Sequence, residues 1–370
     1  MPTRQRARKR ALIQDDDSSG RTDALRSLLS QPRLHVKNLN GIVRSLEREP
    51  DLLSAHKDEL AAVSAGYFES VRQRKQVLLR NGTFSEWVFA DPNLLLQRTL
   101  RECPNLAEFY AQKLSERPCD VDNPWSLIVV FDAFTPASLS CPRPANVKTM
   151  NLAFNFLELG SSALCVDATW LLPVSVRNEM VEQAVGGWSA CLAIYLRAHL
   201  LGETSIQSVG APFRFGGTWY TIFAALRLLS SDGEGLKFAL DLKGYNGIVP
   251  CVMCANVLKK DSGLAHRRPN YVEITCCDHS KFIPTARRDF EDHADEIVHA
   301  YRQVRAGAMH AATLEGLEKA YGIKANPSGL LACRSLRECF SVLEVIREDW
   351  MHGALEDGYK DVRYITAAHQ

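Results

Sequence analysis

Two aspartates stand where strand-like runs of the sequence end. Asp132 closes the apolar run SLIVVFD, and Asp232 lies between a strand pattern and the helical pattern GLKFAL. Carboxylates at neighbouring strand ends can hold two divalent ions, one activating the attacking oxygen in phosphodiester cleavage and one steadying the leaving oxygen. Mg²⁺ suits such a site because it is a hard cation that prefers oxygen ligands. The plainer alternative is an ordinary turn, with Asp132 before Pro136 and Asp232 before Gly233.

A cysteine-rich stretch follows further along the chain. It contains a C-x2-C pair, Cys251 and Cys254, and then the run EITCCDHSKF with Cys276, Cys277 and His279. Thiolate and imidazole ligands in this pattern are typical of a structural zinc site, and zinc would stabilise an insertion that is poor in apolar residues. We expect Cys251, Cys254 and Cys276 to be ligands, with either His279 or Cys277 as the fourth. The alternative is a group of reduced, partly buried thiols.

The stretch REDWMHGALEDG places Asp349 and His352 three residues apart, before Glu356 and Asp357. If Asp349 begins a helix, the two side chains lie on the same side of its first turn. They would then be hydrogen-bond or metal partners beside two further acids. The alternative is an N-cap aspartate followed by a structural histidine.

The elements that would position these residues begin at about Pro124. Three strand-like runs come first: SLIVVFDAF, MNLAFNFLEL and SALCVDATWLLPV. A helix is predicted from Asn178 to Gly202, then a strand that ends at Asp232 and a second helix over GLKFALDLKG. After the cysteine-rich stretch come a helical hairpin and one more strand, SVLEVIRED. This order of elements is that of an α/β, ribonuclease-H-like core with a mixed sheet.

The sequence predicts that the chain is divided into five segments. Residues 1–22 combine a basic cluster with the run DDDSSG, which predicts a disordered tail. Residues 23–123 show helical spacing of apolar residues, and residues 124–248 hold the first part of the core. Residues 249–332 form a cysteine-rich and helical insertion, and residues 333–370 begin the core's C-terminal part. The helical region also carries basic residues that would either contact DNA or simply be solvated, namely Arg72, Arg74, Lys75 and Arg80.

Composition limits the class of protein. The length of 370 residues is enough for about two domains, and the 46% hydrophobic content is enough to fill their cores. Because 44 basic residues face 43 acidic ones, any contact with nucleic acid requires a local patch. No apolar run is long enough for a membrane span, and the N-terminal MPTRQRARKR lacks the apolar region of a secretory signal. The 11 cysteines, an odd number, therefore favour reduced thiols and a location in the nucleus or cytoplasm.

Several of these motifs together resemble the transposases of the CACTA and Plavaka groups. They are FD after the first strand, an acid after the fourth, the run KGYNGIVPCVMC, and DWMH. Those transposases are DDE-type enzymes with a ribonuclease-H-like fold and a cysteine-rich piece within the core. The resemblance implies Asp132 and Asp232 as ligands of catalytic Mg²⁺ or Mn²⁺, with Asp241 as a reserve for the second. It also implies that Asp349 and His352 form the family's D-x2-H signature.

The resemblance implies a transposon-derived, DNA-binding protein of the nucleus. In the family the third catalytic acid follows the D-x2-H signature on a helix, whereas the only acids after His352 here are Glu356, Asp357 and Asp361. We therefore expect a truncated or decayed copy, or one exon's worth of a longer protein, with incomplete catalysis. The alternative is a non-catalytic, zinc-stabilised module that binds nucleic acid or protein; a helical adaptor is a third. DNA is the expected partner, and a homo-oligomer stays open.

Overall fold

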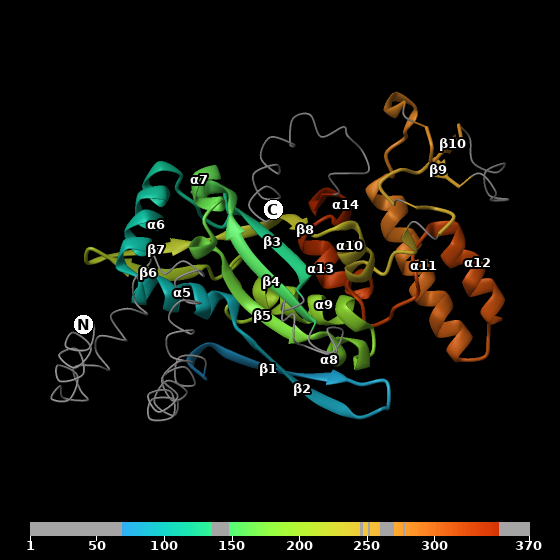
Figure 1. Ribbon diagram of the computed structural model, residues 1–370, viewed down its shortest axis with the longest axis horizontal. Helices are drawn as coiled ribbons and strands as arrows, with labels where there is room; N and C mark the ends of the chain where they lie inside the picture. Colours follow the sequence, from blue (N-terminus) through green and yellow to red (C-terminus); the bar gives the residue numbers. More distant parts are fainter. Residues whose placement is uncertain are drawn as a thin grey trace, which may run out of the picture.

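A mixed β-sheet lies at the centre of the computed structural model (Figure 1), which describes residues 69–134, 148–244, 247–250, 252–259, 270–276 and 278–347. Its strands stand in the order β11-β8-β3-β4-β5. The pairs β3–β4 and β4–β5 are antiparallel, whereas β8 is parallel to β3 and β11 is parallel to β8. The strands are β3 Trp125–Phe134, β4 Thr149–Phe156, β5 Leu171–Arg177, β8 Ala224–Ser230 and β11 Ile346–Arg347. The chain is thus a mixed α/β protein, as its sequence predicts.

Helices and three smaller strand pairs surround this sheet. The helices are α5 Pro92–Glu102, α6 Pro104–Glu116, α7 Ser161–Leu164, α8 Asn178–Gln183, α9 Gly187–Leu201, α10 Gly233–Ala239, α11 Arg287–Arg305, α12 Ala311–Tyr321, α13 Arg334–Cys339 and α14 Val342–Val345. The strand pairs are β1 Arg72–Leu78 with β2 Phe84–Ala90, β6 Ala211–Phe215 with β7 Thr218–Ile222, and β9 Val257–Leu258 with β10 Val272–Glu273. Within these ranges no helix is long and apolar enough to cross a membrane.

The apolar run of β3 is unbroken because both faces of the strand are covered. Successive side chains of a strand point to opposite faces, yet Ile128 and Val129 are both fully buried. On one face, the ring of Phe131 lies 5.9 Å from that of Trp188 at the start of α9. On the other face, Ile128 packs with Leu164 of α7. A strand covered on both faces requires continuous apolar residues rather than an alternating pattern.

Residues 72–90 form the antiparallel hairpin β1–β2, so the prediction of helices throughout residues 23–123 is wrong for this stretch. In β2, Trp87 and Phe89 are buried while Glu86 is exposed, which is the period of a strand. In the sequence, the basic residues of β1 have a pattern like that of the solvent-exposed face of a helix, which explains the wrong prediction. Helices α5 and α6 do confirm the prediction after residue 91, and residues 23–68 lie outside the described residues.

Other elements are more divided than predicted. The helix expected from Asn178 to Gly202 is two helices: α8 ends at Gln183, where Ala184 is extended, and α9 begins after Gly186, whose φ is 86°. The strand expected to end at Asp232 is three strands, β6, β7 and β8. Gly216 and Gly217, with φ values of 56° and 83°, make the turn that separates β6 from β7. The run SVLEVIRED is the short helix α14 followed by β11. Helix α10 and the helical hairpin α11–α12 confirm their predictions.

Candidate functional site

Asp132 and Asp232 lie at the same edge of the central sheet. Strands β3 and β8 are parallel neighbours, with Val130 opposite Ser230. Asp132 comes two residues after Val130, and Asp232 comes two residues after Ser230, so the two stand at about the same level along the parallel pair. Both side chains are exposed to solvent. The strand-end positions predicted for these two acids are therefore adjacent in the fold.

A cavity of about 330 Å³ joins the two aspartates; we call it the acidic cavity. Its lining contains two further carboxylates, Glu182 of α8 and Glu234 of α10. Two cations, Arg80 and Lys148, also line it, together with apolar groups that include Met150, Val181, Trp188 and Phe238. Among the described lining residues, four carboxylates face two cations, so a divalent metal ion here would offset negative charge. Neither glutamate was predicted, although the Asp-Gly-Glu run around Asp232 could have suggested Glu234.

Asp232 is held in place by the start of helix α10. Its Oδ1 accepts a hydrogen bond from the backbone N–H of Gly235 at 2.6 Å, so it is the N-cap of the helix. Gly235 leaves no room for a side chain, because a Cβ there would collide with the hydroxyl of Ser231. The turn suggested by the sequence is therefore real. The cap occupies one carboxylate oxygen and directs the carboxylate toward the acidic cavity.

Asp132 is held by its own strand. Its Oδ1 accepts a hydrogen bond from the backbone N–H of Ala133 at 2.6 Å. Directly across the antiparallel pair stands Asn151 of β4, whose side chain lies on the same face. The buried Oδ1 of Asn151 has no hydrogen-bond partner among the residues that the structure describes. Carboxylate and amide oxygens are both ligands of Mg²⁺, so this neighbour fits the chemistry expected at Asp132.

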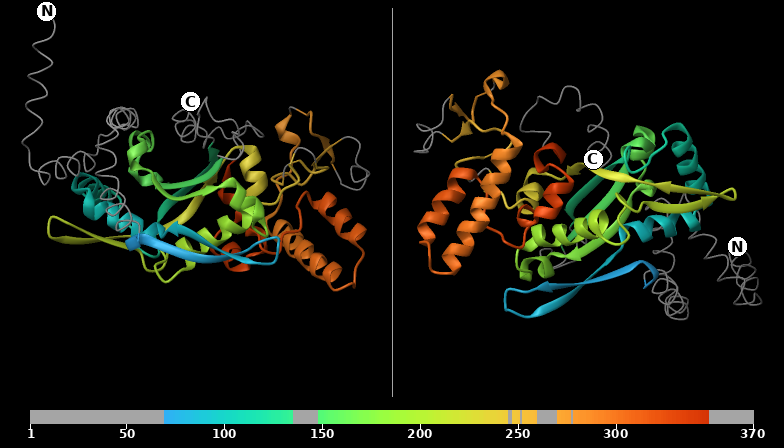
Figure 2. Two further views of the ribbon diagram at one scale, coloured as in Figure 1. Left: turned by 60° about the horizontal axis from the view of Figure 1, so that its bottom comes forward. Right: turned by 180° about the vertical axis from the view of Figure 1, so that it is seen from behind.

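The turn of hairpin β1–β2 brings Arg80 into the acidic cavity. The backbone N–H of Arg80 donates to the carbonyl of Gln183 at 2.8 Å, and that of Val185 donates to the carbonyl of Leu78 at 2.7 Å. Figure 2 shows this hairpin running along one side of the molecule. The four basic residues predicted to share one face have different surroundings. Arg72 and Arg74 form ion pairs with Glu69 and Glu86. Of the four, only Arg80 lines the acidic cavity.

The described residues do not complete a metal site. Within them, no group of three or more histidine, cysteine or acidic side chains is arranged to hold a metal ion. Asp349 and His352 lie outside the described residues. Strand β11 is described as far as Arg347, which stands opposite Ser230, the same residue that faces Val130 across β8. In the sequence, Asp349 comes two residues after Arg347, the same interval by which Asp132 follows Val130 and Asp232 follows Ser230.

Asp241, the reserve for the second metal ligand, has a different place. Its side chain is largely buried, and its backbone adopts the left-handed conformation, with a φ of 53°. It is not part of the lining of the acidic cavity. Both of its carboxylate oxygens lie 2.9 Å from Nδ2 of Asn326, which donates to them. Burial raises the pKa of this carboxyl to about 6, against the opposing effect of hydrogen bonds from Ser189 and Asn326. Asp241 therefore ties a loop to the core and does not serve the acidic cavity.

The predicted zinc ligands are only partly described. Cys254 is buried, and burial raises the pKa of its thiol to about 11. Cys276 is partly exposed, and its Sγ lies 3.8 Å from the carbonyl of Asp278. The parallel pair β9–β10 joins the two segments, but Cys254 comes before β9 and Cys276 comes after β10, so the pairing places them toward opposite ends of the strand pair. Cys251 and Cys277 lie outside the described residues, as does the side chain of His279, so the zinc site stays a prediction.

No protein-family model matches this sequence, and no curated protein is significantly similar to it.

Proposed function

We propose that this chain is a DDE-transposase-like protein with a ribonuclease-H-like core that binds DNA. The order and directions of the strands support the proposal. An antiparallel meander, β5-β4-β3, continues on the other side of β3 into the parallel strands β8 and β11. The observation that carries most weight is that Asp132 and Asp232 lie side by side toward the carboxyl ends of neighbouring parallel strands and line the same cavity.

Asp132 and Asp232 would hold Mg²⁺ or Mn²⁺ at this edge of the sheet. Such ions activate the attacking oxygen and neutralise charge on the leaving oxygen of a phosphodiester. Arg80 and Lys148, which line the same cavity, would bind the phosphates of the strand and keep them beside the carboxylates. The cap from Gly235 would keep Asp232 oriented when the ion binds. A nuclear location belongs to the same proposal, because the substrate is DNA.

The test is metal-dependent nicking of supercoiled plasmid DNA by the full chain. If the proposal holds, nicking with Mg²⁺ or Mn²⁺ falls at least about 100-fold in Asp132→Asn and Asp232→Asn, since each removes a metal-binding charge. Asp292→Asn is the matched control, because Asp292 is an exposed aspartate on helix α11 with a side chain 71% exposed. Nicking that persists in the double variant Asp132→Asn and Asp232→Asn would remove these acids from the mechanism.

A second candidate function is a non-catalytic, zinc-stabilised module that binds DNA on the same scaffold. The observation that favours it is the lack of a three-ligand acidic group within the described part of the chain. This function predicts salt-sensitive DNA binding without nicking at any Mg²⁺ concentration. It also predicts about one bound zinc per chain in protein purified without chelator, lost in the double variant Cys254→Ser and Cys276→Ser. Elemental analysis that finds no zinc in the unaltered chain would exclude it.

A further inference from the structure

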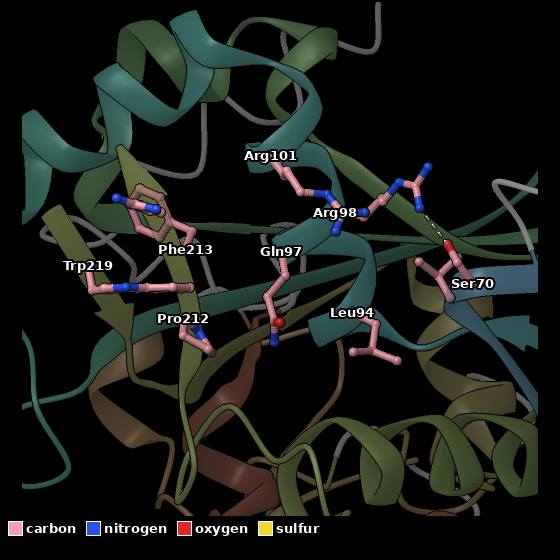
Figure 3. Close-up of a pocket in the computed structure, with 10 residues that line it drawn as sticks. Ser70, Leu94, Gln97, Arg98, Arg101, Pro212, Phe213 and Trp219 are labelled. Atoms are coloured by element: carbon pink, nitrogen blue, oxygen red, sulfur yellow. Dashed lines mark hydrogen bonds between the residues drawn. The ribbon is translucent and has the colours of Figure 1, made fainter. Parts of the chain in front are cut away.

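A second cavity, of about 540 Å³, opens between helix α5 and the hairpin β6–β7 (Figure 3). We call it the basic pocket, because the described residues that line it include Arg98, Arg101 and Arg214 and no aspartate or glutamate. None of its described lining residues lines the acidic cavity. The chain has almost no net charge, so three arginines around one pocket are a local concentration of positive charge.

Helix α5 supplies one wall of the basic pocket. Leu94, Gln97, Arg98 and Arg101 follow the spacing of a single helical face, and all four line the pocket. The opposite face of the helix carries Leu96 and Leu100 into the core. Arg98 is anchored by Ser70, to whose hydroxyl it donates at 3.2 Å, and by Glu102 at 2.8 Å. Arg101 lies 3.9 Å from the same Glu102, and its side chain is 68% exposed.

The hairpin supplies the other wall and an exposed aromatic ring. Arg214 and Trp219 are directly paired across β6 and β7, so their side chains share one face. Trp219 is 69% exposed, although tryptophan is a residue that folding normally covers. The opposite face of the hairpin is fixed: Phe213 is buried and stacks on Tyr220, with 5.4 Å between their rings. Figure 3 shows Trp219 facing the residues of α5 across the pocket.

The surroundings of Arg214 leave it available for an anion. Its side chain is exposed, and no carboxylate of the described residues lies within ion-pairing distance of it. Among the residues that the structure describes, the one carboxylate near Arg101 is that of Glu102, at 3.9 Å. An exposed indole beside available guanidinium groups fits a ligand that has a flat ring and a negative charge. A nucleotide has both, because a base stacks on an aromatic ring while its phosphates contact arginine.

We infer that the basic pocket binds an unpaired nucleotide of single-stranded DNA, with the base stacked on Trp219 and the flanking phosphates on Arg101 and Arg214. Single strands rather than duplexes fit, because the face of a base is accessible only when it is unstacked. An apolar protein partner does not match the charge of the lining. The inference goes beyond cleavage at the acidic cavity, and a chain without nuclease activity would still bind through this pocket.

The test is fluorescence anisotropy of a labelled oligothymidylate with the full chain, in magnesium-free buffer so that cleavage plays no part. Trp219→Ala is expected to weaken binding by about tenfold or more, since a stacked base contributes that much on alanine substitution. Trp219→Phe keeps a ring and should retain most of the affinity. Phe84→Ala is the matched control, because Phe84 is 68% exposed on β2 and lies outside the basic pocket.

The arginines are tested by salt dependence. The double variant Arg101→Gln and Arg214→Gln should lower the slope of log affinity against log salt by about 1.4, at about 0.7 for each phosphate that the protein no longer neutralises. Arg305→Gln, an exposed arginine at the end of α11, should leave the slope unchanged. Wild-type affinity in Trp219→Ala, or equal binding of duplex and single strand, would overturn the inference. Thermal melting verifies that each variant is folded.

Discussion

Asp241 shows how one buried carboxyl links the stability of the fold to pH. Its pKa is raised from 3.8 to about 6, chiefly by burial. The folded chain therefore binds this proton more tightly than the unfolded chain does. The resulting stabilisation is fully present below about pH 3.8 and is lost as the pH rises through about 6. At neutral pH the charged carboxylate stays in place because Asn326 and Ser189 donate hydrogen bonds to it.

Replacing Asp241 by asparagine is expected to remove this pH dependence. Between about pH 4 and pH 7 the free energy of unfolding of the unaltered chain should fall by about 3 kcal/mol more than that of Asp241→Asn, because two pKa units correspond to about that amount. Urea unfolding followed by circular dichroism at several pH values measures the difference. Asp292→Asn is the control for a surface carboxyl. Identical pH profiles for Asp241→Asn and the unaltered chain would contradict the assignment.

At the scale of residues, the sequence predicted the candidate acids better than their surroundings. Asp132 and Asp232 were identifiable because each follows a strand pattern that is visible along the chain. The role of Asp241 was not, since it depends on Asn326, 85 residues away. The basic pocket was missed for the same reason, because α5 and the hairpin β6–β7 come together only in the folded chain.

Among the elements, helix α5 depends on one buried capping residue. Asp91 is fully buried and accepts hydrogen bonds from the backbone N–H groups of Asn93 and Leu94, each at 2.9 Å. Its other oxygen accepts from Gln73 of β1 at 2.5 Å and from Thr204 at 3.0 Å. The cap therefore connects the helix to the hairpin β1–β2 and to the segment after α9.

Asp91→Ala is expected to lower the free energy of unfolding by about 2–4 kcal/mol, because it removes an N-cap and leaves buried donors without an acceptor. Chemical denaturation measures the change. Asp122→Ala, at an exposed turn position, should change the same free energy by less than about 0.5 kcal/mol. A loss no larger in Asp91→Ala than in Asp122→Ala would show that the cap contributes little.

The success of element prediction also varied with local context. The runs of β3, β4 and β5 were recognised because each is a compact apolar stretch bounded by loop residues. The hairpin β1–β2 was not, since β1 carries three basic residues and becomes a strand only through pairing with β2. The paired glycines at 216 and 217 were the visible signal of a hairpin turn that divides the longer run.

In the whole molecule, opposite charges are separated between two cavities although the net charge is only +1. The acidic cavity lies at the carboxyl ends of β3 and β8, and the basic pocket lies between α5 and the hairpin β6–β7. This separation suits a protein that binds cations in one place and a polyanion in another. The overall charge alone gave no indication of either.

Binding of Mg²⁺ to the acidic cavity should raise the melting temperature of the whole molecule. A ligand that binds only the folded state at ten times its dissociation constant stabilises it by about 1.4 kcal/mol. The rise should be absent in the double variant Asp132→Asn and Asp232→Asn and preserved in Asp292→Asn. Differential scanning calorimetry with and without Mg²⁺ measures it, and an equal rise in the double variant would place the ion elsewhere.

The docking of the β1–β2 turn has a consequence for which sequences the site tolerates. The turn is fixed to the α8–α9 junction by main-chain hydrogen bonds to Gln183 and Val185 and by a backbone bridge between Leu79 and Ala184. Such contacts do not depend on which side chains the junction carries. Gln183 can therefore change, and Val185 can change to any residue except proline, which has no N–H to donate to Leu78, while Arg80 keeps its place in the acidic cavity. Related sequences can therefore differ at the α8–α9 junction and still keep an arginine at position 80 in the cavity.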